Sequence, residues 1–171
     1  MPANRHLFTD TPLPTEIVVD SSFVFHALID DVRSGYHVPA RGFAERLRGA
    51  DVTLIYSSLI FLEAPQCWKR LYNTGALIPS QRGPNLASDR VNAFNEANTA
   101  LQIFLSAFNR KEVRVTKNLM KSATALVAEF NLGSHDAIAI AISRAGVPDI
   151  AALDRGFKNV DGIELWDGLL T

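Results

Sequence analysis

Four acidic residues lie in strongly apolar stretches of the sequence: Asp20, Glu63, Asp136 and Asp154. An ionised carboxylate is costly to bury unless a cation or a hydrogen-bond donor compensates its charge. Four such acids brought together by a fold would repel one another when ionised. A hard divalent cation resolves this conflict, because Mg²⁺ and Mn²⁺ prefer carboxylate oxygens and keep several of their waters.

The chemistry expected of such a site is hydrolysis of a phosphodiester. One or two ions would activate a water for attack on phosphorus and would stabilise the leaving oxygen. We expect Asp20, Asp136 and Asp154 to be the direct metal ligands. Glu63 would bind a second ion, or would orient the attacking water as a general base.

Each acid also has a purely structural interpretation. Asp136 could complement the positive end of a helix, and Asp20 could cap a helix or close a turn. Asp154 precedes an Arg-Gly pair and could be a turn residue. Glu63 could form an ion pair with the basic residues 69–70, one to two helical turns further on. The functional interpretation rests on the four acids in combination.

Apolar segments that favour strands alternate with amphipathic segments that favour helices. The expected strands are residues 16–20, 51–56, 112–116, 148–154 and 162–166. The expected helices are residues 22–35, 39–48, a helix after Ser57 or Ser58 that carries Glu63, and residues 87–108, 117–131 and 134–146. This alternation predicts a three-layer α/β/α fold with a central, mainly parallel sheet of four to five strands.

The acids fall where such a fold places its sites, beyond the carboxyl ends of the parallel strands. Asp20 ends the first expected strand and Asp154 ends the fourth, so both should emerge at one edge of the sheet. Asp136 lies in the first turn of a helix that should begin at that edge. Ser21 or Ser22 is the expected cap of the first helix, and Ser134 plays that part for the helix of Asp136.

The length of 171 residues and the hydrophobic fraction of 47% suit one domain with a real core. Residues 1–15 are polar and contain three prolines, so we expect a poorly ordered lead-in followed by one domain over residues 16–171. Residues 74–88 are rich in glycine and proline and are expected to form a loop.

Composition excludes several classes of protein. The lone Cys67 cannot form an internal disulfide, which favours a reducing compartment. The sequence has no run of about 18 apolar residues and no apolar core of a signal peptide near its start, so we expect a cytoplasmic protein. A formal net charge of −1 argues against binding nucleic acid over the whole surface. No glycine-rich phosphate-binding motif is present.

The chain resembles the PIN domain, particularly the VapC-like toxins of toxin–antitoxin pairs. The matching segments are VVDSSFV around Asp20, SSLIFLEA around Glu63, LGSHDAIAIAIS around Asp136 and AALDRGFKNVDGIELW around Asp154. Their order and spacing agree with the family over residues 17–166. The resemblance implies a PIN-like fold, a ribonuclease that uses Mg²⁺ or Mn²⁺, and these four acids as its site. It also implies an RNA substrate, a cognate antitoxin and a homodimer.

The chain departs from the family pattern in two respects. Ala152 stands where many members carry Thr or Ser, two residues before the last acid, so a hydroxyl is missing at that position. The chain is also longer than a compact toxin, and the excess lies in the lead-in and in residues 74–108.

Binding of RNA requires positive charge around the acids, because phosphate contacts dominate nonspecific affinity. Arg155 and Lys158 follow Asp154 directly, and Lys117 and Lys121 share one face of an expected helix. Further candidates are Lys69, Arg70, Arg82 and Arg90, with Trp68 and Tyr72 as possible stacking partners for bases and His135 as a contact to substrate.

Three other functions compete with ribonuclease activity. The chain could be a catalytically silent PIN scaffold that binds RNA or protein. It could be a phosphatase with Asp20 as nucleophile, although that chemistry usually needs a second acid where Ser22 stands. It could also cut DNA, since no residue of the sequence identifies a reader of the 2′-hydroxyl.

Overall fold

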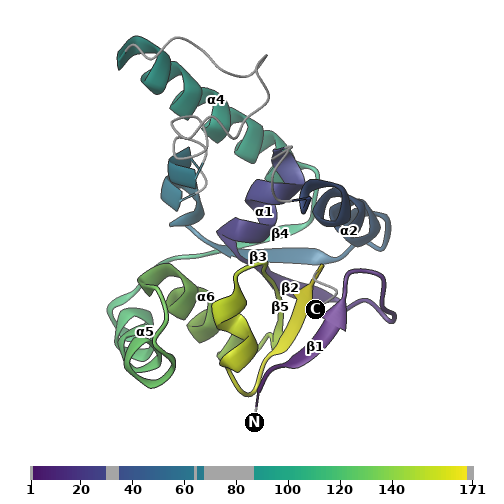
Figure 1. Cartoon of the computed structure of the whole chain (residues 1–171), viewed down its shortest axis with the longest axis vertical. Helices are drawn as coiled ribbons and strands as arrows, with labels where there is room; N and C mark the ends of the chain where they lie inside the picture. Colours follow the sequence, from purple (N-terminus) through teal and green to yellow (C-terminus); the bar gives the residue numbers. More distant parts are fainter. Residues whose placement is uncertain (1, 30–34, 64, 68–86, 169–171) are drawn as a thin grey trace.

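The computed structural model describes residues 2–29, 35–63, 65–67 and 87–168 (Figure 1). Its centre is a sheet of six parallel strands in the order β1-β6-β5-β2-β3-β4. The strands are β1 (Asn4–Leu7), β2 (Glu16–Val19), β3 (Thr53–Ser57), β4 (Arg110–Val113), β5 (Asp149–Ala151) and β6 (Glu164–Asp167). The expected parallel sheet is confirmed, and it has one strand more than the upper bound predicted.

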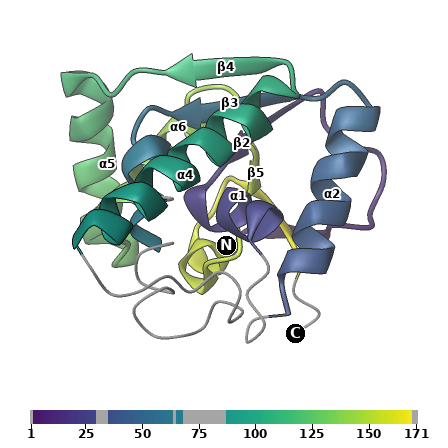
Figure 2. The same cartoon turned by 90° about the horizontal axis from the view of Figure 1, so that it is seen from above.

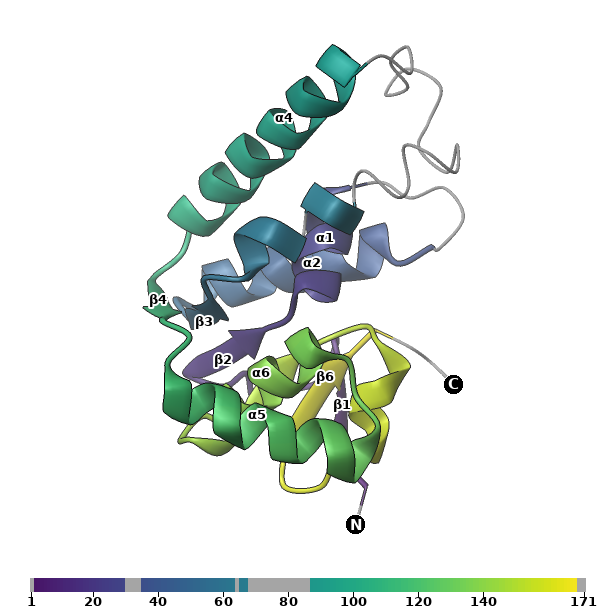
Figure 3. The ribbon, with the colours of Figure 1, turned by 90° about the vertical axis from the view of Figure 1, so that its left-hand side faces the viewer.

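Helices cover both faces of the sheet. Figures 1 and 2 show α1 (Ser21–Leu28), α2 (His37–Gly49) and α4 (Ala87–Ser106) on one face. The opposite face carries α5 (Lys117–Phe130) and α6 (Ser134–Arg144), which pack against each other (Figure 3). The three-layer α/β/α architecture predicted from the sequence is therefore confirmed.

The additional strand lies in the part of the chain that was expected to be poorly ordered. β1 pairs in parallel with β6, from Asn4 beside Glu164 to Leu7 beside Asp167. The Arg5 guanidinium binds the buried carboxylate of Asp167, with its Nε and one terminal nitrogen each 3.0 Å from an oxygen. The expectation of a poorly ordered lead-in over residues 1–15 is wrong for residues 4–7, because an edge strand can be held by backbone pairing and ion pairs without an apolar sequence.

Several element ends differ from the sequence prediction. α1 ends at Leu28 instead of Gly35, and Ile29 already has an extended backbone. β4 covers residues 110–113 instead of 112–116, and its mostly exposed side chains fit an edge strand. Residues 68–86, which include the expected glycine- and proline-rich loop up to residue 86, lie outside the described residues.

The cores on the two faces of the sheet hold the strands that carry the site. Ile17 and Val19 of β2 face the α1–α2–α4 layer, whereas Val18 faces the α5–α6 layer. This alternation matches a strand buried on both faces. Within the described residues, no single helix has the length and apolarity needed to cross a membrane, and only the pair α5 and α6, bent by 113°, meets such a test together.

Candidate active site

The ends of two neighbouring strands bring Asp20 and Asp154 to the same edge of the sheet. β2 and β5 pair in parallel with Val19 beside Ala151. The pairing continues one step further, because the backbone N–H of Asp20 donates to the carbonyl of Ala151 at 3.0 Å. The chain then leaves the sheet at both positions. This edge, at the carboxyl ends of the strands, is called the carboxyl edge below.

Asp20 is buried, with only 4% of its surface exposed. It caps α1, because its Oδ2 accepts the backbone N–H of Ser22 at 2.9 Å and the Ser22 hydroxyl at 2.5 Å. Burial raises the pKa of Asp20, and the Asp154 charge adds to this, while the hydrogen bonds from Ser22 and Ser21 oppose it. The expected serine cap is wrong: the acid itself caps the helix.

The Ser22 hydroxyl also joins the two strand ends, since its Oγ accepts the backbone N–H of Leu153 at 3.0 Å. Ala152, where the family often has a hydroxyl, is fully buried and apolar. The hydroxyl that is missing at Ala152 is therefore replaced in part by that of Ser22, which follows β2 and donates a hydrogen bond to Asp20. Its position two residues after Asp20 suits a capping contact, but the sequence did not reveal the link to Leu153.

Asp136 lies in the first turn of α6. Its pKa is raised to about 7, first by burial and then by the charges of Asp20, Asp154 and Glu63, while the backbone N–H of Gly133 lowers it. Asp136 is therefore within electrostatic reach of the other three predicted acids. Gly133 occupies the cap position of α6 without a side-chain bond, so the prediction that Ser134 caps this helix is wrong.

Glu63 reaches the cluster from the helical segment that follows β3. Its pKa is raised to about 7, first by burial and then by the charge of Asp20, while a hydrogen bond with the Ser21 side chain lowers it. Its Oε1 lies 2.9 Å from Nδ1 of His135. The residues 69–70 suggested as partners of Glu63 lie outside the described residues, and the sequence did not identify His135 as a partner of Glu63.

Asp154 is the exposed member of the cluster. It caps the short 3-10 helix η2 (Arg155–Asn159), where its Oδ1 accepts the backbone N–H of Gly156 at 2.8 Å. Its charge raises the pKa values of both Asp20 and Asp136. It therefore has the turn role considered from the sequence and also belongs to the acidic cluster.

The donor set fits a hard divalent cation, although the side chains do not enclose one. Within the described ranges, no three acidic, histidine or cysteine side chains are arranged to hold an ion together. Protein donors occupy oxygens of Asp20, Glu63 and Asp154 instead. Raised carboxylate pKa values are relieved by a cation, and Mg²⁺ commonly binds through one or two carboxylates with waters completing its shell.

A small cavity of about 20 Å³ lies beside two of the acids, Asp20 and Glu63. Its polar lining comes from Asp20, Ser21, Ser57, Glu63 and His135, and the remaining lining residues are apolar. This volume holds about one water molecule. A water held there would have carboxylate, hydroxyl and imidazole groups as hydrogen-bonding partners.

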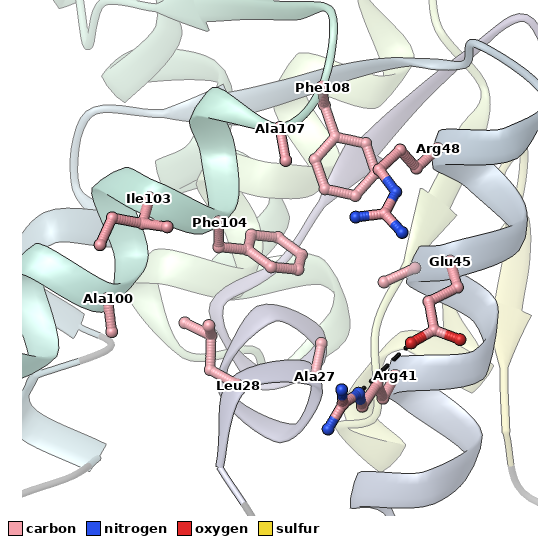
Figure 4. Close-up of a pocket in the computed structure, with 11 residues that line it drawn as sticks. Ala27, Leu28, Arg41, Glu45, Arg48, Ala100, Ile103, Phe104, Ala107 and Phe108 are labelled. Carbon is pink, nitrogen blue, oxygen red and sulfur yellow. Dashed lines mark hydrogen bonds and ion pairs between the residues drawn. The ribbon is translucent and has the colours of Figure 1, made fainter.

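A larger groove of about 410 Å³ lies away from the acids, between α1, α2 and α4 (Figure 4). Its lining includes Leu28, Ile103 and Phe104, and the Arg41–Glu45 ion pair lies on its α2 side. It contains none of the four acids, so we assign the chemistry to the carboxyl edge despite the larger volume of this groove.

The predicted RNA-binding cations occupy different settings. Arg155, Lys117 and Lys121 are exposed, at the start of η2 and in the first two turns of α5. Lys158 is half-buried, and its Nζ lies 4.0 Å from Asp167, so it is less available to a phosphate. The other basic and aromatic candidates at positions 68–72 and 82 lie outside the described residues, and so does the side chain of Arg90.

No protein-family model matches the sequence. No curated protein matches it either. The structure is similar to that of VapC20 from Mycobacterium tuberculosis, a toxin that cleaves the sarcin–ricin loop, with a TM-score of 0.54 and 19% identity over 82% of this chain and 92% of that one.

Two further solved structures are similar to this chain. PAE2754 from Pyrobaculum aerophilum has a TM-score of 0.56 and 16% identity, over 90% of this chain and 84% of that one. A toxin–antitoxin complex from Klebsiella pneumoniae has a TM-score of 0.52 and 16% identity, over 86% of this chain and 94% of that one. At these identities the similarity establishes the fold, which is the PIN-like fold of VapC-type toxins.

Proposed function

We propose that the chain is a metal-dependent endoribonuclease that hydrolyses RNA phosphodiester bonds, and that it acts as the toxin of a toxin–antitoxin pair. The observation that carries the proposal is the electrostatic coupling of Asp136 to Asp20, Glu63 and Asp154 at one edge of a PIN-like sheet. A cluster that raises two carboxylate pKa values to about 7 is unfavourable without a cation and is typical of functional sites. The sarcin–ricin loop cleaved by VapC20 supports RNA as the substrate class.

The four acids would have different roles at the metal, which follow from how each of them is buried and hydrogen-bonded. Asp20 is buried and fixed by Ser22, so it would hold an ion at a constant position. Asp136 and Asp154 would complete the protein ligands. Mg²⁺ or Mn²⁺, when bound, would polarise the phosphate and lower the pKa of a coordinated water. Glu63 would hold that water or accept its proton, because its side chain lines the same small cavity as Asp20.

The test is cleavage of a labelled mixed RNA pool by the purified chain with Mg²⁺, Mn²⁺ or a chelator. Asp20→Asn should abolish cutting. Asp51→Asn is a matched control, because Asp51 is exposed, lies outside the cluster and has a φ of 59° that asparagine tolerates. Metal-dependent cutting by wild type and the control alone supports the proposal.

Two other results would contradict the proposal. Equal cutting by Asp20→Asn and wild type would place the activity elsewhere. Tight RNA or protein binding without cutting would favour the alternative of a catalytically silent PIN scaffold.

The partner proposed for this toxin is an antitoxin, and the groove between α1, α2 and α4 is the surface that we assign to it. The similarity to a toxin–antitoxin complex supports such a partner. Ile103, which is 65% exposed, lines this groove together with the apolar Leu28 and Phe104, and exposed apolar patches often mark protein-binding surfaces. Ile103→Asp should weaken capture of the protein encoded beside this gene and leave RNA cleavage intact. The homodimer and the cytoplasmic location stay predictions.

A further inference from the structure

His135 makes a contact that the proposed chemistry does not yet use. It is the second residue of α6 and directly precedes Asp136. Its Nδ1 lies 2.9 Å from Oε1 of Glu63, which belongs to the helical segment after β3. The pair therefore connects two elements across the carboxyl edge.

The Glu63–His135 pair lies beside the acidic cluster and not in the core. The Glu63 side chain is 20% exposed and the His135 side chain 37% exposed, so neither belongs to the core. Both line the cavity of about 20 Å³ together with Asp20 and Ser21. A second hydrogen bond, with the Ser21 side chain, reaches Glu63 from α1. Glu63 is thus held between two elements and faces the space beside Asp20.

Orientation matters for Glu63 more than for the other acids. A glutamate has one more rotatable bond than an aspartate, and holding it in one rotamer costs side-chain entropy. The other acids are fixed by backbone donors: Asp20 by Ser22, Asp154 by Gly156 and Asp136 by Gly133. For Glu63 the described donors are side chains, those of His135 and Ser21.

We infer that His135 is a positioning residue: its Nδ1–H donates to Glu63 and keeps that carboxylate beside Asp20, where it would bind a cation or the attacking water. This inference rests on the proposed function, because it gives Glu63 a role at the metal. It requires a donor at the position of Nδ1 and does not depend on the charge of the imidazole. Partners that orient metal-binding groups commonly change metal affinity by 10- to 100-fold when they are removed.

The geometry of the contact provides a sharp test. The amide nitrogen of asparagine is as far from the backbone as Nδ1 of histidine, whereas the amide of glutamine reaches the distance of Nε2. His135→Asn should therefore retain the contact, and His135→Gln and His135→Ala should lose it. Ser134→Ala is the matched control, because Ser134 is the exposed neighbouring residue and makes no capping bond.

The measurement is the affinity for Mn²⁺ by titration calorimetry, with urea unfolding in chelator to show that each variant is folded. We expect about tenfold weaker binding for His135→Ala and His135→Gln and near-native binding for His135→Asn and Ser134→Ala. Unchanged binding by His135→Ala, or equal binding by the Asn and Gln variants, would overturn the inference while leaving the proposed function intact. A wild-type chain that binds no Mn²⁺ would overturn both.

Discussion

The protonation of Glu63 and Asp136 should make the free energy of unfolding depend on pH. The pKa values of Glu63 and Asp136 are raised to about 7 from ordinary values of 4.5 and 3.8. The folded chain therefore holds these protons more tightly than the unfolded chain does. By linkage, the free energy of unfolding of the metal-free protein should fall as the pH rises from about 4 through 7, by about 3–4 kcal/mol for each of the two groups before solvent screening reduces the effect.

Urea unfolding at a series of pH values, in the presence of a chelator, measures this dependence. Asp136→Asn should weaken this pH dependence, because the variant removes one titrating group and one charge that repels Glu63. At pH 8 the variant should be more stable than wild type, although it binds Mn²⁺ more weakly. Asp51→Asn should behave like wild type. A stability that rises between pH 5 and 8 in the wild type alone would contradict the repulsion at this site.

Gly133 limits the space available to the carboxylate of Asp136. A Cβ at position 133 would stand 3.0 Å from Oδ2 of Asp136, closer than ordinary contact allows. The backbone of Gly133, with φ of −62°, accepts alanine, so Gly133→Ala should displace the carboxylate and leave the fold intact. We expect several-fold weaker Mn²⁺ binding by calorimetry. Gly42→Ala, with nothing within 4 Å, should stabilise α2 by about 0.5–1 kcal/mol and leave Mn²⁺ binding unchanged.

The sequence predicted which acids would meet at the carboxyl edge but not what holds each of them. Asp20 and Asp154 follow strands, and parallel pairing brings such ends together. The donors from His135 and Leu153 come from residues 72 and 131 positions away from their partners, Glu63 and Ser22. No local pattern encodes such contacts. The catalytic roles of the acids stay predictions.

The edge strand β1 shows how an element without an apolar pattern joins the fold. The sequence Asn-Arg-His-Leu offers no strand signal, and prolines follow it. Its position depends on contacts with a part of the chain far away in sequence: backbone pairing with β6, and the ion pair of Arg5 with the buried Asp167. Local propensity therefore missed the strand, whereas the buried strands β2 and β3, with their apolar runs, were predicted within a few residues.

Arg5→Ala should destabilise the fold by about 1–2 kcal/mol, because it removes the bidentate partner of a buried carboxylate. The value stays below the full cost of breaking a buried pair, since the Arg5 side chain is 32% exposed and solvent screens it. Urea unfolding measures the loss. Asn4→Ala is the control on the same strand: it removes an exposed hydrogen bond to Glu164 and should cost less than about 1 kcal/mol. Equal losses would mean that the Arg5 ion pair adds nothing.

At the scale of the whole molecule, helix α1 separates the acidic cluster from the groove between α1, α2 and α4. Asp20 caps the start of this helix, and Leu28 lies in the groove at its other end. Eight helical residues span about 12 Å, so a partner in the groove would lie close to the acids without touching Asp20. Because only α1 separates the two, a protein bound in the groove would lie about one short helix away from the acidic cluster.

The number of cations that contact phosphates decides how RNA binding by the whole chain should respond to salt. The 17 lysines and arginines are balanced by 18 acidic residues, and among the predicted RNA-binding cations in the described residues Lys117, Lys121 and Arg155 are exposed near the carboxyl edge. Three contacts with single-stranded RNA correspond to a slope of about −2 in log affinity against log salt concentration. Fluorescence anisotropy with labelled RNA and the Asp20→Asn variant, from about 50 to 200 mM KCl, measures this slope without cleavage.

Changing Lys117 and Lys121 together to glutamine should make the slope less negative by about 1.4 units, because two phosphate contacts are lost. Arg48→Gln is a control that removes one positive charge away from this edge, since Arg48 lies near the end of α2 where the chain returns to the start of β3. If the slope changed by the same amount per charge in both variants, RNA binding would depend on the total charge of the chain and not on the lysines at this edge. A wild-type slope near −6 would show that the chain binds RNA through many more cations than the described edge offers.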